Sequence, residues 1–370
     1  MNKNLSLTMI LLLLTSGPAF AAGADAFKGT WVKPDESTIP VGAAGDAIRY
    51  GREVLTDTYR ILGAGSTKYN PPISGNRLAC TSCHLDAGTA ALAGPWAVVA
   101  LKYAPPGPYS SRSHDYRTPE VRINDCMQRS MNGILLPDTS DEMLAIKAYW
   151  NWLATGMKVA SYKDVKGTGF LSIPDMTRPA DPVRGAEVYK ANCEACHQAD
   201  GDGIWDEDAQ RAVYPAVFGP NSFNDGAGIF RLRSGVGFVY GNMPYGHADA
   251  SMATAVPPDT SSLLSKEDAW DVLAYVISQP RPLWRNRLTD WGNLKGPTGI
   301  PDWMVKFPDA GYPVYYPRAD YATANLCTNP DISDANPPVY SADKHKYGPW
   351  ADMITVQQSI ITRYKASACP

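Results

Sequence analysis

The pattern Cys-x-x-Cys-His occurs twice in the sequence, at residues 80–84 and 193–197. This is the attachment pattern of a c-type haem, in which two thiols add across the haem vinyl groups and the histidine that follows binds the iron. One copy alone can be a redox or zinc motif, but two copies in an exported chain favour two covalently bound haem c groups. The residues expected to hold them are Cys80, Cys83, His84, Cys193, Cys196 and His197.

A candidate for the opposite face of the second iron lies in the sequence Gly-Asn-Met-Pro at residues 241–244. Its position, after the haem motif and before a closing helix, is where a cytochrome c presents a thioether to iron. A sulfur ligand of this kind raises the haem potential, which suits electron relay. Met243 is therefore the expected ligand, with Met252 and His247 as weaker alternatives and a core methionine as the plainer interpretation.

The first haem has no comparable Met-Pro loop, but Cys126 lies between its motif and the next closing helix. Arg122, Cys126 and Ser130 are four residues apart and share one face of a predicted helix. A nearby cation lowers the pKa of a thiol and favours the thiolate, which is the form that binds metal. A buried structural cysteine remains the alternative for Cys126. Other candidates to ligate this iron are Met127, Met131, Met143, Met157 and His114.

Several helices are expected to position these residues. In the first half they cover about 46–62, 119–133 and 139–155. Thr118 is the expected cap of the second of these, and the capping-box pattern Thr139-x-x-Glu142 opens the third.

In the second half a short helix over 182–192 precedes the haem motif, and Ser265-x-x-Asp268 caps a closing helix. The order of helix, haem motif, loop, sixth ligand and closing helix thus occurs twice. It predicts a mainly α fold of two tandem cytochrome c domains with long loops, plus a mostly irregular C-terminal extension. The expected divisions are a signal peptide 1–22, a first domain 23–160, a linker 161–180, a second domain 181–282 and an extension 283–370.

The first 22 residues have the pattern of a secretory signal: Lys3, an apolar run over 9–14, and a small-x-small site at 19–21. The apolar run is too short to cross a bilayer, which needs ~20 apolar residues, so cleavage near residue 21 or 22 is favoured over a membrane anchor. Covalent haem attachment occurs outside the cytoplasm, and both signals predict a periplasmic protein. No membrane span is expected after cleavage, and a net charge of −3 gives no reason to expect nucleic acid.

The chain has seven cysteines, of which three lie outside the haem motifs. An odd set of three in an oxidising compartment suggests one disulfide and one special thiol. Since Cys126 is the candidate thiol, a Cys327–Cys369 disulfide is predicted, which would hold the C-terminal extension in place.

Seven stretches resemble one family. They are residues 80–88, 122–126 and 129–133 and, in the second half, 218–228, Arg231-Leu232-Arg233, Asn242-Met243-Pro244 and Trp270-Asp271-Val272. Together they are similar to the thiosulfate dehydrogenases, periplasmic dihaem cytochromes c of which some members also run as tetrathionate reductases. The resemblance covers roughly 45–282 and says little of the extension.

The resemblance implies that Cys126 is the distal ligand of the first haem and that thiosulfate is oxidised to tetrathionate there. It implies a His197/Met243 pair at the second haem, and a substrate site lined by Arg112, Arg122 and Ser130. In some members a lysine precedes the ligand methionine and exchanges with it; here Asn242 stands at that position. Two arginines and a hydroxyl suit the sulfonate oxygens of thiosulfate, a small dianion.

The main alternative is a dihaem electron carrier without substrate chemistry, and a third is another sulfur-compound oxidase with a cysteine-ligated haem. A periplasmic cytochrome or similar redox protein is the expected electron partner.

Overall fold

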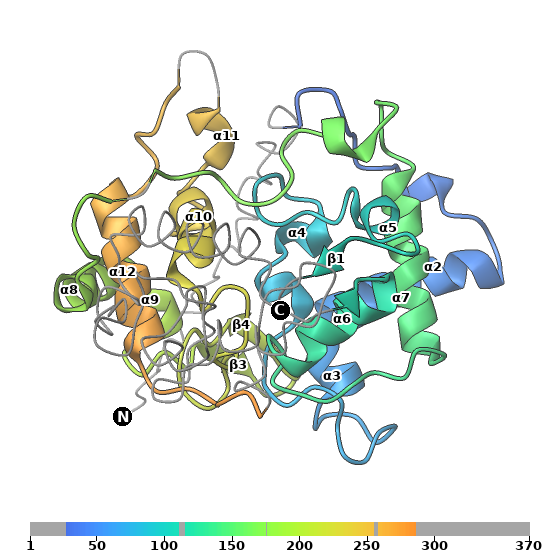
Figure 1. The fold of residues 1–370 in the computed structure, drawn as a ribbon. Helices are drawn as coiled ribbons and strands as arrows, with labels where there is room; N and C mark the ends of the chain where they lie inside the picture. Colours follow the sequence, from blue (N-terminus) through green and yellow to red (C-terminus); the bar gives the residue numbers. More distant parts are fainter. Residues whose placement is uncertain (1–26, 111–114, 175, 255–257, 286–370) are drawn as a thin grey trace, which may run out of the picture.

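The computed structural model describes residues 27–110, 115–174, 176–254 and 258–285. Over these residues the protein is mainly helical and has two halves, each with one Cys-x-x-Cys-His motif (Figure 1). The expected signal peptide, Arg112, His114 and the predicted Cys327–Cys369 pair lie outside the described residues. None of the described helices is both long and apolar enough to span a bilayer.

The helices of the first half follow the predicted order with shifted ends. The expected helix 46–62 is divided at Asp57, and the expected helix 119–133 ends at Gln128. Thr118 accepts the predicted capping bond, from the Val121 amide. The third helix is capped by Ser140, which accepts from the Met143 amide, and not by Thr139 as expected. The elements are η1 Glu36–Thr38, α2 Ala43–Thr56, α3 Thr58–Leu62, η2 Cys80–Ser82, α4 Leu85–Gly88, α5 Val99–Lys102, β1 Tyr109–Ser110, β2 Asp115–Tyr116, α6 Pro119–Gln128, α7 Asp141–Ala154 and η3 Tyr162–Asp164.

The second half repeats this order more compactly. The helix predicted over 182–192 has those bounds, and Ser265 caps the closing helix by accepting from the Asp268 amide, as expected. Two short antiparallel hairpins, β1–β2 and β3–β4, were not predicted. The elements are α8 Pro182–Asn192, α9 Glu194–His197, β3 Ile204–Asp206, β4 Arg211–Tyr214, α10 Leu232–Asn242, α11 Ala250–Ala253 and α12 Lys266–Ser278.

In each half the leading helix crosses the closing helix at a glycine. A Cβ added to Gly51 of α2 would lie 2.0 Å from the Ala145 carbonyl oxygen of α7, and one added to Gly185 of α8 would lie 1.9 Å from the Asp271 carbonyl oxygen of α12. Only glycine permits backbones to approach this closely. The same helix crossing is therefore built twice, once in each half.

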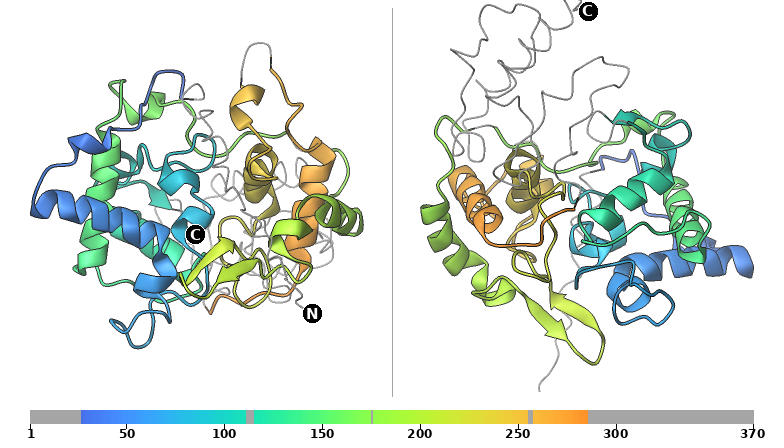
Figure 2. Two further views of the ribbon diagram at one scale, coloured as in Figure 1. Left: turned by 180° about the vertical axis from the view of Figure 1, so that it is seen from behind. Right: turned by 60° about the horizontal axis from the view of Figure 1, so that its bottom comes forward.

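The two halves lie side by side, and the segment between them packs against both (Figure 2). The amides of Leu92 and Gly94 donate to the carbonyls of Gly167 and Gly169 at 2.7 and 2.8 Å. One residue later the ring of Phe170 meets that of Phe238 in α10, with centroids 5.5 Å apart. Residues in the expected linker 161–180 are thus part of the packed structure, and they help to fix the halves relative to each other.

Candidate functional site

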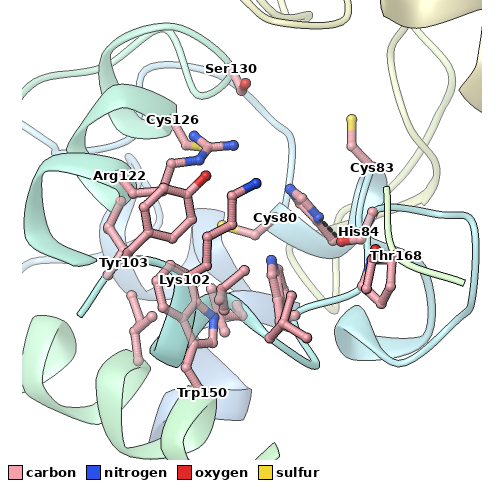
Figure 3. A pocket seen from close by; sticks show the side chains of 18 of the residues that line it. Cys80, Cys83, His84, Lys102, Tyr103, Arg122, Cys126, Ser130, Trp150 and Thr168 are labelled. Atoms are coloured by element: carbon pink, nitrogen blue, oxygen red, sulfur yellow. Dashed lines mark hydrogen bonds between the residues drawn. The ribbon is translucent and has the colours of Figure 1, made fainter. Parts of the chain in front are cut away.

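A cavity of about 530 Å³ lies in the first half, next to the first Cys-x-x-Cys-His motif (Figure 3). Apolar residues of α5, α6 and α7 form part of its wall. The predicted site residues on its lining are Cys80, Cys83, His84, Arg122, Cys126 and Ser130.

The ring of His84 is held from behind by a backbone carbonyl. Its Nδ1 lies 2.5 Å from the Gly94 oxygen, and the Nδ1–H donates to it. A Cβ on Gly94 would come within 3.0 Å of the same nitrogen, so glycine permits this close approach. Burial lowers the pKa of His84 to about 4, which keeps the imidazole neutral. The ring therefore presents Nε2 as an acceptor, as an iron-binding histidine does.

Cys126 and Arg122 form a pair on the other side of the cavity from His84 (Figure 3). They lie one turn apart on α6, and Nη1 of Arg122 donates to Sγ of Cys126 at 2.8 Å. The charge of the sulfur, more than any other cause, raises the pKa of the Arg122 guanidinium above its usual range. A cation this close stabilises thiolate, the form of cysteine that binds metal.

Ser130 lies just beyond the end of α6, and its hydroxyl lies on the same side of the cavity as Cys126 (Figure 3). The structure thus brings together three of the four residues expected at the substrate site, and Arg112 lies outside the described residues. Among the other candidates to ligate this iron, Met127 and Met131 line the cavity, whereas Met143 and Met157 do not.

Three further residues on the cavity wall were missed by the sequence analysis: Lys102, Tyr103 and Trp150. Figure 3 shows Tyr103 beside Arg122, with the Lys102 side chain reaching the cavity from the end of α5. A lone lysine at the end of the mostly apolar stretch 97–103 is the signal that would have identified it.

Trp150 is 5% exposed, and its Nε1 has no hydrogen-bond partner among the described residues. A buried donor is costly to leave unpaired, so this one points to a bound group that brings an acceptor. Haem c fits, because its carboxylates can accept from a donor such as Trp150, and its vinyl groups and iron match the thiols and imidazole of the motif. None of the five described cysteines forms a disulfide, so these thiols are available for attachment.

A second cavity, of about 560 Å³, lies in the second half beside Cys193, Cys196 and His197. Nδ1 of His197 lies 2.8 Å from the Pro215 oxygen, which repeats the arrangement at His84. Met243 lines this cavity, while His247 is exposed and does not, and the Met252 side chain lies outside the description.

The two cavities share part of their walls. Leu78 and Cys83 line both, so one cysteine of the first motif also faces the second site. Groups bound in the two cavities would be close neighbours.

The chain is similar to known proteins over most of its length. Residues 182–280, which include most of the residues that line the second cavity, match the cytochrome c family. The thiosulfate dehydrogenase of Psychrobacter arcticus is 36% identical over 284 residues, which are 76% of this chain and 78% of that protein. The thiosulfate dehydrogenase of Allochromatium vinosum is 37% identical over 263 residues, 70% of this chain and 86% of the relative.

The chain belongs to the thiosulfate dehydrogenase family. A solved structure, the thiosulfate dehydrogenase (TsdBA) from Marichromatium purpuratum, superposes with a TM-score of 0.59 at 29% identity. The match covers 71% of this chain, which spans about half (51%) of the length of that structure's chain. This family membership and the match to the cytochrome c family identify haem c as the type of cofactor that this protein binds.

Proposed function

We propose that this protein is a periplasmic dihaem cytochrome c that oxidises two thiosulfate ions to tetrathionate in the first cavity. The single observation that carries the proposal is the Arg122–Cys126 contact of 2.8 Å, in the same cavity as a haem-attachment motif. An electron carrier needs neither a thiol nor a cation at that place.

The first haem would be attached to Cys80 and Cys83, and His84 and Cys126 would bind its iron. The second would be attached to Cys193 and Cys196, and His197 and Met243 would bind its iron. Bound haem c supplies iron that takes up one electron at a time.

The residues of the first cavity hold the substrate. Arg122 offers guanidinium hydrogens to the sulfonate oxygens of thiosulfate, and Ser130 and Arg112 are proposed as further donors. Held in this way, the ion presents its outer sulfur toward Cys126. Joining the outer sulfurs of two thiosulfates forms one S–S bond and releases two electrons. These leave by way of the second half to a redox protein, proposed to be a periplasmic cytochrome.

Each half of the chain is assigned one role in the proposed reaction. Residues 23–160 are proposed as the domain that binds substrate and 181–282 as the domain for electron transfer, after cleavage of a signal peptide near residue 21 or 22.

The test is an assay of the purified holoprotein with thiosulfate and ferricyanide, and with tetrathionate and a reduced viologen. We expect ferricyanide reduction that depends on thiosulfate, with tetrathionate formed in a ratio of one to two. Two haems per chain are expected in the reduced pyridine spectrum. A protein that carries both haems but leaves thiosulfate unchanged would instead be an electron carrier without substrate chemistry.

A further inference from the structure

The helix that carries Cys126 ends at a residue whose carbonyl is capped from the other half of the chain. The carbonyl oxygens in the last turn of a helix have no partner within the helix. At the end of α6, those of Cys126 and Met127 accept from the amides of Met131 and Gly133, at 2.9 and 2.8 Å. The next one, of Gln128, accepts from the side-chain amide of Asn224 at 2.9 Å.

Asn224 is well placed to fix this helix end, because it is 1% exposed and all its polar groups are engaged. Its Nδ2 also donates to Oδ1 of Asn132 at 3.1 Å, and its backbone amide donates to the Arg129 carbonyl at 3.3 Å. Its Oδ1 accepts from the Gly226 amide at 2.9 Å, which holds the side chain in position. Three bonds from one residue thus reach the turn 128–132.

A second asparagine ties the same turn to the same loop. Nδ2 of Asn76 donates to the Ser130 carbonyl at 2.8 Å and to the Ser222 carbonyl at 3.1 Å. The backbone of Ser130 is therefore linked through Asn76 to a position two residues before Asn224. Both residues expected to face substrate from this region, Cys126 and Ser130, depend on a turn that the second half of the chain holds.

We propose that Asn224 is a positioning residue for the thiosulfate site. Asn224 is not among the residues that line the first cavity, and it acts through the carbonyls of Gln128 and Arg129. Its role is to hold the end of α6 so that the Cys126 sulfur and the Ser130 hydroxyl keep their places opposite His84. The inference rests on the proposed function, because that function makes Cys126 a haem ligand and Ser130 a donor to the substrate.

The sharpest variant is Asn224→Asp, measured in the holoprotein. Aspartate keeps the shape and the bond from Gly226 but replaces the donating amide with an oxygen that faces two acceptors, the Gln128 carbonyl and Asn132 Oδ1. We expect the axial-ligand signal of the Cys126-side haem, in electron paramagnetic resonance, to shift or split, while the signal of the other haem stays unchanged. We expect kcat/KM for thiosulfate to fall about tenfold or more.

Asn221→Ala is the matched control, since Asn221 is in the same loop but its amide donates only to Asp202 of its own half, at 2.9 Å. It should keep both haem signals and the wild-type kinetics. Asn132→Gly is a milder second variant, because the backbone of Asn132 has a φ of 47°, which glycine adopts without strain. This variant removes one of the groups that accept a hydrogen bond from Asn224. It should therefore shift the same haem signal, but by less than Asn224→Asp does.

Wild-type spectra and kinetics in Asn224→Asp would overturn the proposal, as would equal changes at both haems, which would indicate general loosening. The spectra are recorded without thiosulfate, so they decide the matter even if the wild-type protein fails to oxidise thiosulfate. If Cys126→Gly leaves the wild-type spectrum unchanged, the proposed ligation fails. In that case the position of the end of α6 is tested by the rate at which iodoacetamide labels Cys126. Faster labelling in Asn224→Asp than in the wild type supports the positioning role, and an unchanged rate contradicts it.

Discussion

The two halves of the molecule share a frame and differ in what lies across the cavity from the motif histidine. Each has a glycine at its helix crossing and a histidine whose Nδ1 faces a backbone carbonyl. Across from His84 lie a thiol and a guanidinium, while the second cavity offers Met243, next to a proline. The comparison teaches that the two halves repeat one arrangement of helices and histidine, and that the residue across the cavity is what distinguishes them. In the proposed function, this residue separates substrate chemistry from electron relay.

Removing Cys126 should have the largest effect. Cys126→Gly leaves the four attachment cysteines in place, so both haems should remain bound. It should change the axial signal of one haem and abolish turnover of thiosulfate and of tetrathionate, because the first cavity then lacks the feature that distinguishes it from the second. If the variant carries both haems and still turns over substrate at nearly the wild-type rate, Cys126 is not what distinguishes the first half from the second.

Arg122→Ala should have the next largest effect. It removes a sulfonate donor but leaves the Cys126 sulfur in place, so the haem signals should persist while KM for thiosulfate rises. A lost charge-assisted hydrogen bond is worth about 1.5–3 kcal/mol, which corresponds to about a ten- to hundredfold rise. Arg60→Ala is the control, because this exposed arginine pairs with Glu53 away from the cavity and should keep the wild-type KM. A fall in kcat with unchanged KM would mean that Arg122 serves the thiolate more than the substrate.

Met243→Gly should affect the relay and not the substrate site. The sulfur-to-iron charge-transfer band of one oxidised haem should disappear, and electron exit to an acceptor should slow. KM for thiosulfate should stay near its wild-type value, since the first cavity is untouched. Retention of the band would assign the ligand to Met252 or another donor.

The smallest expected effect concerns two carboxylates that are fully buried, one in each closing helix. Glu142 accepts from Tyr50, Lys68 and Tyr69, and Asp271 accepts from Arg178, Arg184 and the Asp181 amide. Burial alone would raise the pKa of Glu142, but the bonds from Lys68, Tyr50 and Tyr69 outweigh it and lower the pKa from 4.5 to about 2. The bonds to Asp271 likewise outweigh its burial and lower its pKa.

A lowered carboxyl pKa contributes stability that is complete above the unfolded pKa and is lost as the pH falls through the folded one. The free energy of unfolding should therefore decline between about pH 4.5 and 2 in the wild type. Glu142→Gln should flatten that decline by about 1–2 kcal/mol, measured by urea denaturation across this range. An unaltered pH dependence would show that this carboxylate is not linked to stability.

Local signals in the sequence predicted much of the fold. Thr118 before Pro119 placed the start of α6, and the bounds of α8 were predicted correctly, because caps and prolines act within one turn. The start of α7 was predicted one residue early, since Thr139 and Ser140 both have a capping hydroxyl. The end of α6 was placed too late, because its last carbonyl is capped by a residue from the other half.

The candidate site was also predictable only in part, because contacts between distant parts of the chain bring several of its residues together. Spacing along one helix joins Arg122 to Cys126, which the structure places in contact. Trp150 and Tyr103 come from other helices or loops, and no periodicity relates them to the haem motif. Contacts such as those of Asn224 depend on how two distant loops pack, which the pattern of apolar residues does not encode.

The bonds between the halves also join parts of the chain that are synthesised at different times. Asn224 lies 96 residues after Gln128, Ser222 lies 146 after Asn76, and the Asn242 amide donates to the Leu92 carbonyl 150 residues earlier. A ribosome makes the first half well before these partners exist, and contacts so distant in sequence form late in folding. The newly made first half therefore carries its haem motif and its thiol while the end of α6 still lacks its cap. The neighbourhood of Cys126 is completed only when the later part of the chain folds against it.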